Sequence, residues 1–451
     1  MAESAREVIG LVADDPAGFA ELPTPHRAQP PDGPLGWHGY DAARARAEER
    51  TGETESVVAG IATIGGVRAV VIAFEFGFFG GSLGERTGDR LQTAHETARE
   101  RRLPVVSLTA TGGSRMQEGM RALTQLQRVA RQSALTRAAG LPQLAVVRDP
   151  TTGGGWATLG AGADVILALP GAQVGFAGSR VRPPGADPAA YTAEAQLAAG
   201  QLDAVVPHAE LRTTLARWLT LLNRPPTRSP EGPGRPEPPE ALGAATPAAG
   251  GWETVRRARS PARPRAETYL DAYFAFRQQI SGDRCGGTDP GMLCGFGRRE
   301  DRTIAYAAQR GTATRPAGYR TAARLIRLAD RLAIPVLTLV DTPGAANDAE
   351  AERTGAGAAL ADLFDAVATA RVPVTTLVIG EGGSGGALAL AAPGDTWVTP
   401  DSYFSVIAPE QAAAILKRTP EEASATAEQL RLRPPDLLDL GFARGVRPRG
   451  R

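Results

Sequence analysis

The sequence predicts an α/β protein made of two tandem copies of one domain. Three observations predict this. Apolar, strand-like segments alternate with helix-like segments, as a parallel sheet with crossover helices requires. A proline- and glycine-rich stretch, residues 223–251, is expected to be a linker between two halves of similar size. Landmarks of the first half recur in the second at a constant offset, so that Pro104 corresponds to Pro335 and Pro142 to Pro373.

The first half begins with a proline-rich and then charged arm, residues 1–50, which is expected to carry one helix. Residues 57–64 and 67–74 are rich in β-branched side chains and flank Gly65-Gly66, which is typical of a hairpin. The remaining expectations are a loop at 79–82, helices over 85–101 and 118–139, strands over 104–110, 142–147 and 165–169, and an alanine-rich helix after residue 155.

The second half is organised around VPVTTLVIGEGGSGGALAL, residues 372–390. The β-branched run 374–379 suits a buried parallel strand, and the following Ala/Leu run favours a helix. Between them stand five glycines: Gly380, Gly382, Gly383, Gly385 and Gly386. A helix that starts directly after a glycine turn offers free N–H groups to negative charge, and glycine admits a ligand close to the backbone. The stretch is therefore a candidate oxyanion hole.

Other interpretations of this stretch stay open at this stage. Gly380, Gly382 and Gly385 also fit the G-x-G-x-x-G dinucleotide fingerprint, which is weak evidence in a glycine-rich chain and belongs in an early βαβ unit. The segment 382–386 fits G-x-S-x-G and would make Ser384 a nucleophile, although all four histidines lie in the first half. A turn that only allows close helix–strand packing is the third alternative.

The repeat gives the glycine turns a partner in the other half. At the same offset, Thr111-Gly112-Gly113 corresponds to Thr342-Pro343-Gly344, and Gly154-Gly155 corresponds to Gly385-Gly386. If the two turns of one copy are adjacent, an N–H group from each can meet on one carbonyl oxygen, and two copies then stabilise two oxyanions. Two unrelated α/β domains with shared turn chemistry are the alternative.

The amino-acid composition indicates which kinds of partner, metal site and membrane contact are not expected. The net charge of +1 does not indicate a nucleic-acid surface or an acidic partner. Lys417 is the single lysine, and Cys285 and Cys294 have no neighbouring histidine or cysteine with which to bind a metal. The chain has no run of 18 apolar residues and no signal-peptide core at its start, so we expect a soluble cytoplasmic protein without membrane contact.

At these motifs the sequence resembles the carboxyltransferase component of biotin-dependent acyl-CoA carboxylases, with β- and α-type subunits fused in that order. The first half resembles the β-type subunit in FFGGSLGERTGDRL (78–91), ATGGSRMQEGM (110–120), DPTTGGGWATLGAGAD (149–164) and VGFAGSRV (174–181). The second half resembles the α-type subunit in GYRTAARLIRLADR (318–331), LVDTPGA (339–345), AERTG (351–355), VIGEGGSGGALAL (378–390) and YFSVIAPEQAAAIL (403–416).

The resemblance implies two crotonase-like domains, residues 51–222 and 252–447, that move a carboxyl group from carboxybiotin to the α-carbon of an acyl-CoA. It implies that Gly112-Gly113 with Gly154-Gly155 hold the thioester enolate oxygen, and that Gly344-Ala345 with Gly385-Gly386 hold the ureido oxygen of biotin. The released biotin is then the base for the α-proton. The resemblance further assigns cofactor contacts to Phe79, Gly80, Gly81, Arg115, Gly382 and Gly383, with a structural ion pair as the alternative for Arg115.

The sequence also departs from this family. It has no four-cysteine zinc ribbon, so no zinc is expected, and it has neither a Met-Lys-Met biotinylation motif nor an ATP-binding carboxylase domain. The resemblance therefore implies a separate biotin carboxyl carrier protein and biotin carboxylase as partners. It also implies a homo-oligomer with active sites between first-half and second-half domains. A biotin-independent acyl-CoA decarboxylase or hydrolase, and a non-catalytic scaffold paralogue, are the competing functions.

Overall fold

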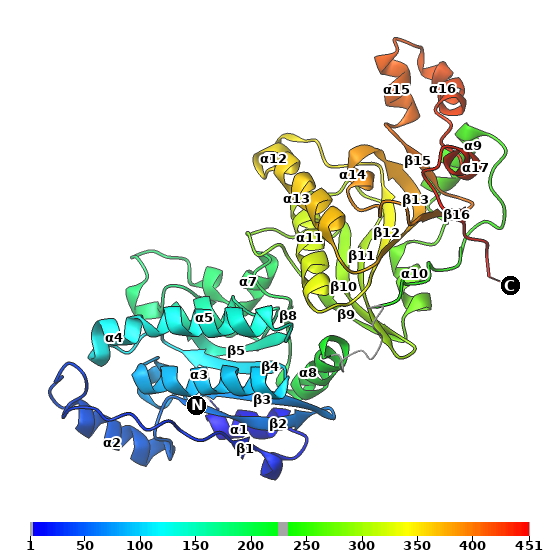
Figure 1. Ribbon diagram of the computed structural model, residues 1–451. Helices are drawn as coiled ribbons and strands as arrows, with labels where there is room; N and C mark the ends of the chain where they lie inside the picture. The colour runs from blue at the N-terminus through cyan, green and yellow to red at the C-terminus, as the bar shows by residue number, and fades with distance from the viewer. Residues whose placement is uncertain (1–2, 224–232, 451) are drawn as a thin grey trace. The chain divides into compact units, whose positions relative to one another are not determined.

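The computed structural model describes residues 3–223 and 233–450, and the chain divides at Pro225/Pro226 into two compact units (Figure 1). Within the described residues, each unit is an eight-stranded mixed sheet covered by helices. The sheet order is β1-β2-β3-β4-β5-β6-β8 in the first unit, with β7 on β5, and β16-β14-β13-β12-β11-β10-β9 in the second, with β15 on β13.

The strands of the first unit are β1 (Ala20–Glu21), β2 (Val57–Ile64), β3 (Val67–Phe74), β4 (Val105–Thr111), β5 (Gln143–Thr152), β6 (Val165–Ala168), β7 (Val174–Gly175) and β8 (Ala204–Val205). Its helices are α1 (Ala5–Val12), α2 (Tyr40–Thr51), α3 (Glu85–Arg101), α4 (Gly119–Leu123), α5 (Gln125–Ala138), α6 (Gly153–Gly155), α7 (Ala193–Ala198) and α8 (His208–Leu222).

The strands of the second unit are β9 (Phe276–Ile280), β10 (Met292–Arg299), β11 (Arg302–Gln309), β12 (Val336–Thr342), β13 (Val374–Gly383), β14 (Thr396–Val398), β15 (Tyr403–Ser405) and β16 (Gly445–Val446). Its helices are α9 (Gly251–Arg259), α10 (Ala266–Tyr273), α11 (Pro316–Arg331), α12 (Ala349–Arg353), α13 (Ala356–Thr369), α14 (Ser384–Leu388), α15 (Pro409–Ile415), α16 (Ala423–Gln429) and α17 (Pro434–Asp439).

The predicted hairpin and the buried parallel strands are present. β2 and β3 are antiparallel, and Gly65 and Gly66 take positive φ angles of 57° and 76° between them, as a tight two-residue turn needs. The parallel strands β4 and β5 carry long apolar runs because both faces of the sheet are covered.

The two units repeat the same order of elements, and strand register fixes the equivalence. Val70 on β3 pairs with Val105 on β4, and Ala305 on β11 pairs with Val336 on β12. The offset between equivalent residues is thus slightly larger in the hairpins than from β4 and β12 onward. The difference lies in the connection between β3 and α3, which is longer than its counterpart and holds Phe79-Gly80-Gly81.

The arm differs from the expectation of one helix. Residues 5–12 and 40–51 form two helices, and Ala20–Glu21 adds a strand to the sheet beside β2. Ala5, Val8 and Val12 of α1 are fully buried, because this amphipathic helix covers apolar surface of the first unit.

Two further expectations were too simple. The helix predicted over 118–139 is interrupted at Thr124 and forms α4 and α5. The alanine-rich segment after residue 155 is a short π-helical turn, Trp156–Gly160, rather than a long helix. The expected linker 223–251 lies partly outside the described residues. Its part from residue 233 onward belongs to the second unit, where Ala241 donates its N–H to Pro448 O.

Candidate functional site: two pairs of glycine turns

In the first unit, the turns that follow β4 and β5 lie against one another. Gly153 has a φ of 62°, and a Cβ atom at this position would lie 3.1 Å from Gly113 Cα. A Cβ atom on Gly113 would lie 3.7 Å from the nitrogen of Gly154. The left-handed conformation of Gly153 and its close approach to Gly113 favour glycine at this position, and the two turns lie in contact.

The second unit repeats this arrangement after β12 and β13. A Cβ atom on Gly383 would lie 2.0 Å from Pro343 O, and one on Gly386 would lie 2.3 Å from the nitrogen of Ala345. The position equivalent to Gly153 is Ser384, whose φ of 59° is almost the same. Because a serine in this conformation is strained, the shape of the turn is retained here at an energetic cost.

Three of the predicted N–H groups already donate within the protein. Gly112 donates to Gly80 O at 2.8 Å, and Gly113 and Gly344 donate to Thr111 Oγ1 and Thr342 Oγ1, both at 3.1 Å. These bonds hold the shape of each turn. A ligand therefore needs other N–H groups.

The next residue along each turn supplies such a group. In the bridge between Thr314 and Ala345, the hydrogen bonds run from Thr314 N–H to Gly344 O and from Ala346 N–H to Thr314 O, so the Ala345 N–H takes no part. The bridge between Leu83 and Ser114 has the same form and leaves the Ser114 N–H out. Sequence reasoning missed Ser114, although the offset of the repeat pairs it with Ala345 and could by itself have identified it.

The starts of α6 and α14 offer further donors. Gly154 and Gly155, and their equivalents Gly385 and Gly386, occupy the first turn of these helices, where N–H groups have no acceptor inside the helix. A Cβ atom on Gly386 would meet the backbone of the neighbouring turn, whereas one on Gly385 would meet no heavy atom within 4 Å. Gly385 therefore faces open space.

The other glycines of this motif have packing roles. Gly380 and Gly382 lie within β13 rather than in a loop after it. A Cβ atom on Gly380 would lie 2.3 Å from Arg263 Nη2, and one on Gly382 would lie 2.3 Å from the ring of Phe404. This placement does not match the dinucleotide fingerprint, whose glycines form the turn between strand and helix. Gly382 and Gly383 instead allow close packing beneath the turn.

Ser384 has no histidine base in its own unit. The histidines of the chain are His26, His38, His95 and His208, and all belong to the first unit. The geometry of the second unit therefore gives no support to a Ser–His nucleophile.

Arg115 lies inside the first unit rather than at its surface. Its side chain is 1% exposed and its guanidinium contacts Glu55, Glu118 and the Tyr40 hydroxyl. Burial alone would raise the pKa of Glu55, but the adjacent guanidinium outweighs burial and lowers the pKa to about 2. This matches the structural ion pair, which was the alternative to a coenzyme A contact.

The loop Phe79-Gly80-Gly81 supports the same region. The Arg115 guanidinium lies 5.4 Å from the centre of the Phe79 ring, and Gly80 O accepts the Gly112 N–H. A Cβ atom on Gly81 would lie 2.0 Å from Ala110 O at the end of β4. These contacts place the loop directly behind the first glycine turn.

Neither a metal cluster nor a membrane helix is found in the described parts of the chain. Within residues 3–223 and 233–450, no group of three or more His, Cys, Asp or Glu side chains is arranged to hold a metal ion. In the same residues, no helix combines the length and apolar character needed to cross a bilayer.

Comparison with known proteins decides the family. Residues 37–205 match the model of the carboxyl transferase domain, and residues 247–447 match that of the acetyl co-enzyme A carboxylase carboxyltransferase-like family. The chain is 40% identical to the acetyl-coenzyme A carboxylase carboxyl transferase subunits beta/alpha of Salinispora arenicola, over 96% of this chain and 78% of that protein. The chain belongs to this carboxyl transferase family.

Other members of the family are also similar. The corresponding beta/alpha protein of Saccharopolyspora erythraea is 38% identical over 90% of this chain and 74% of the relative. A probable biotin-dependent acyl-coenzyme A carboxylase beta3 subunit of Mycobacterium bovis is 33% identical over 91% of this chain and 83% of the relative.

Solved structures of carboxyl transferases share the fold. The transcarboxylase 12S structure with methylmalonyl-coenzyme A bound has a TM-score of 0.80 at 22% identity, covering 99% of this chain and 86% of that chain. A single-chain long-chain acyl-CoA carboxylase has a TM-score of 0.74 at 20% identity, covering 99% of this chain and 46% of that chain. The predicted fold class, two tandem crotonase-like α/β domains, is confirmed.

Proposed function

We propose that this carboxyl transferase moves a carboxyl group from carboxybiotin to the α-carbon of acetyl-CoA and so forms malonyl-CoA. The observation that carries this proposal is the paired turn geometry. Each unit brings a strand-end turn and a helix start together, and each pair includes N–H groups outside the internal hydrogen bonds. A transfer between two acyl-type groups needs two such sites, because negative charge develops on an oxygen at each reacting partner.

In the first unit, the donors are the Ser114 N–H with those of Gly154 and Gly155. They would hold the thioester oxygen of the acyl-CoA as it gains negative charge. Gly112 and Gly113 would act indirectly, because their own N–H groups fix the turn that presents Ser114. Well-placed donors of this kind each contribute roughly 100-fold or more to the rate.

In the second unit, the Ala345 N–H with those of Gly385 and Gly386 would hold the ureido oxygen of carboxybiotin. These residues fit that group because backbone N–H donors at a helix start suit a neutral or negative oxygen, and because the space beside Gly385 is open. When bound, carboxybiotin supplies the carboxyl group. The residues of this chain orient that group and stabilise the charge that develops on it.

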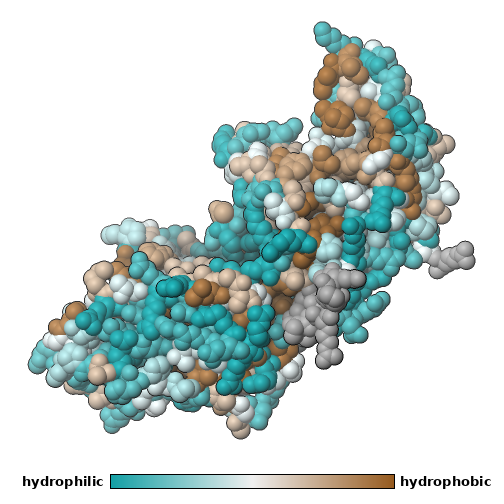
Figure 2. Space-filling view, viewed as in Figure 1, coloured by the Kyte–Doolittle hydropathy of each residue, from teal (hydrophilic) through white to brown (hydrophobic). Residues whose placement is uncertain are grey.

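The chain would work with a biotin carboxyl carrier protein and a biotin carboxylase, and as a homo-oligomer with active sites shared between copies. Exposed apolar residues beside the turns support the proposed homo-oligomer. Met116, Phe176 and Val406 are 77%, 75% and 72% exposed. Figure 2 shows hydrophobic residues gathered at the position of α15, where Ile415 and Leu416 are exposed. Such surface is typical of protein interfaces. A cytoplasmic location stays a prediction.

The proposal is tested with the purified full chain, malonyl-CoA and biocytin as a soluble biotin analogue. We expect loss of malonyl-CoA that requires biocytin and yields acetyl-CoA. Loss that proceeds equally well without biocytin would instead indicate the decarboxylase or hydrolase. No reaction with any acyl-CoA, together with binding to an active carboxyl transferase, would indicate the scaffold.

The acyl specificity needs a separate comparison. Malonyl-, methylmalonyl- and ethylmalonyl-CoA are offered under the same conditions, and the values of kcat/KM are compared. We expect the highest value for malonyl-CoA. A value of kcat/KM at least tenfold higher for a branched substrate would still support carboxyl transfer, but it would show that the acceptor is an acyl-CoA other than acetyl-CoA.

A further inference from the structure

The carbonyl group of Gly386 is held by two buried side chains from outside its own helix. It accepts a hydrogen bond from the Tyr319 hydroxyl at 3.1 Å and another from Gln309 Nε2 at 3.2 Å. Tyr319 lies on α11 and Gln309 at the end of β11, and both are fully buried. Burial raises the pKa of Tyr319, so its hydroxyl stays protonated and available as a donor.

The preceding peptide is fixed as well. The carbonyl of Gly385 accepts the N–H of Ala389 at 3.0 Å. Gly386 also lies close against the other turn, since an ideal Cβ on it would lie 2.3 Å from Ala345 N and 2.6 Å from Tyr319 Oη. Both peptide planes that flank Gly386 are therefore set by groups in the second unit.

The same side chains connect the two turns to each other. Gln309 Nε2 also donates to Thr314 Oγ1 at 3.2 Å, and Thr314 Oγ1 lies 3.5 Å from Thr342 Oγ1. Thr342 Oγ1 in turn accepts the Gly344 N–H. A buried chain of polar groups thus runs from the helix start at Gly386 to the strand-end turn at Gly344. Hydrogen-bonded chains of this kind reinforce one another in a medium of low dielectric constant.

Within the described residues 3–223, the first unit has no counterpart of this chain of polar groups. The residues equivalent to Gln309, Thr314 and Tyr319 are Phe74, Leu83 and Gly88, none of which carries a side-chain donor. Phe74 and Leu83 are fully buried. The backbone turns are repeated in both units, whereas, within the described residues, the side-chain donors that hold the Gly386 carbonyl are found only in the second.

We propose that Tyr319 and Gln309 are positioning residues that set the second pair of turns for its ligand. This inference rests on the proposed function and assigns the support to the site for the ureido group of biotin. An oxyanion-type site depends on preset donors, because donors that must reorient during the reaction lose much of their effect. By holding the Gly386 carbonyl on two buried donors, the pair keeps its repulsive dipole from turning toward the oxygen that gains negative charge.

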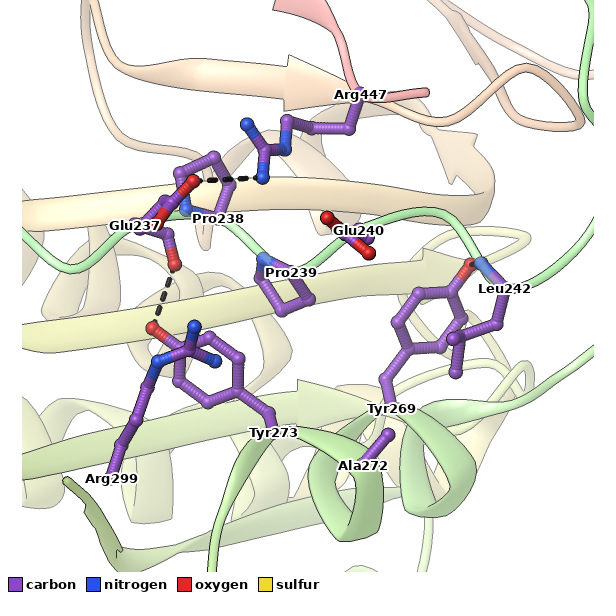
Figure 3. Close-up of a pocket in the computed structure, with 10 residues that line it drawn as sticks. All are labelled: Glu237, Pro238, Pro239, Glu240, Leu242, Tyr269, Ala272, Tyr273, Arg299 and Arg447. Atoms are coloured by element: carbon purple, nitrogen blue, oxygen red, sulfur yellow. Dashed lines mark hydrogen bonds and ion pairs between the residues drawn. The ribbon is translucent and has the colours of Figure 1, made fainter. Parts of the chain in front are cut away.

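The test compares Tyr319→Phe with a matched control, Tyr273→Phe. Tyr273 is also a buried tyrosine of the second unit whose hydroxyl donates to a backbone carbonyl, Glu237 O at 2.7 Å. It lines a cavity of about 330 Å³ with Arg299 and Arg447 (Figure 3), and no glycine of the turns lines that cavity. The two variants remove the same kind of hydrogen bond, one beneath the turn and one away from it.

In the biocytin-dependent reaction, we expect Tyr319→Phe to lower kcat about tenfold and to leave KM for malonyl-CoA within twofold, because one buried hydrogen bond corresponds to about a factor of ten. Gln309→Met is expected to act in the same direction. Tyr273→Phe should keep the wild-type kcat, although its melting temperature falls as in Tyr319→Phe.

Amide hydrogen exchange of residues 384–391 gives a readout that does not need activity. Tyr319→Phe should speed exchange in this segment about tenfold, and Tyr273→Phe should not. Wild-type exchange in Tyr319→Phe overturns the inference, as does wild-type kcat. If the wild-type chain shows no biotin-dependent reaction, the proposed function fails, and the exchange measurement alone still decides whether the pair positions the turn.

Discussion

Alanine at Gly386 tests the contact between the two turns of the second unit most directly. An alanine Cβ would lie 2.3 Å from the nitrogen of Ala345 and 2.8 Å from the carbonyl carbon of Gly344. Both are backbone atoms, so no flexible side chain can move aside. The turns must separate by about 1 Å before the contact reaches 3.4 Å, where ordinary van der Waals distances begin.

A separation of this size is expected to lower the reaction rate strongly and the stability of the fold moderately. A misplacement of about 1 Å in a catalytic arrangement costs about 100-fold in rate. Overpacking lowers the free energy of unfolding by about 1–3 kcal/mol. The higher helix propensity of alanine offsets up to about 1 kcal/mol of this loss. Because domains are stable by about 5–15 kcal/mol, we expect Gly386→Ala to fold and to lose at least about 100-fold in kcat.

The assay is the biocytin-dependent loss of malonyl-CoA at saturating substrate, with thermal unfolding as the check on folding. Gly357→Ala is the matched control, because Gly357 is also a helical glycine of the second unit and its Cβ would meet no heavy atom within 4 Å. This control should keep the wild-type rate. A folded Gly386→Ala protein with more than a third of the wild-type rate would refute the reasoning.

Three further predictions concern other parts of the same argument. Gly385→Ala keeps its N–H and folds normally, but its methyl enters the open space beside the turn, so we expect kcat to fall at least about tenfold; an unchanged rate removes Gly385 from the site. Arg115→Met leaves Glu55 buried without its partner, and urea denaturation should show a loss of about 3–5 kcal/mol; a loss below about 1 kcal/mol would contradict the buried ion pair. His95 is fully buried, and burial, with a smaller effect of Arg99, lowers its pKa to about 4. The unfolded chain therefore takes up a proton first, and stability falls as the pH drops from about 6.5 to 4. The urea midpoint of His95→Gln should lose this part of its pH dependence, and identical slopes for both proteins would disprove it.

Local signals in the sequence were enough for the order of elements and for the repeat. Periods of β-branched residues predicted the parallel strands, and Gly65-Gly66 predicted the hairpin turn that the structure shows. The constant offset between the halves led to the paired turns, because an internal duplication leaves equivalent residues equally far apart in the chain. It would also have led to Ser114 had the offset been applied to Ala345.

Contacts between distant residues were not predictable in this way. The N–H of Gly112 donates a hydrogen bond to Gly80 O. The side chain of Arg115 contacts Glu55 and Tyr40, which lie 60 and 75 residues away in the chain. No local sequence pattern predicts which donor will form a hydrogen bond with a given acceptor. The structure therefore replaced Gly112 and Gly113 by Ser114 as the available donor of the first turn, kept Ala345 but not Gly344 in the second, and changed Arg115 from a ligand contact to an ion pair.

The sequence by itself determined two α/β units and their glycine turns, since strand periodicity and turn chemistry are properties of short segments, and its longer motifs carried the resemblance to the family. Only the tertiary structure decided which backbone donors are left for a ligand and that a polar chain from Gln309 to Thr342 lies beneath one turn pair alone. The physical reason is that hydrogen bonds are exclusive. A donor's availability depends on every group folded against it, and that information is distributed over the whole unit.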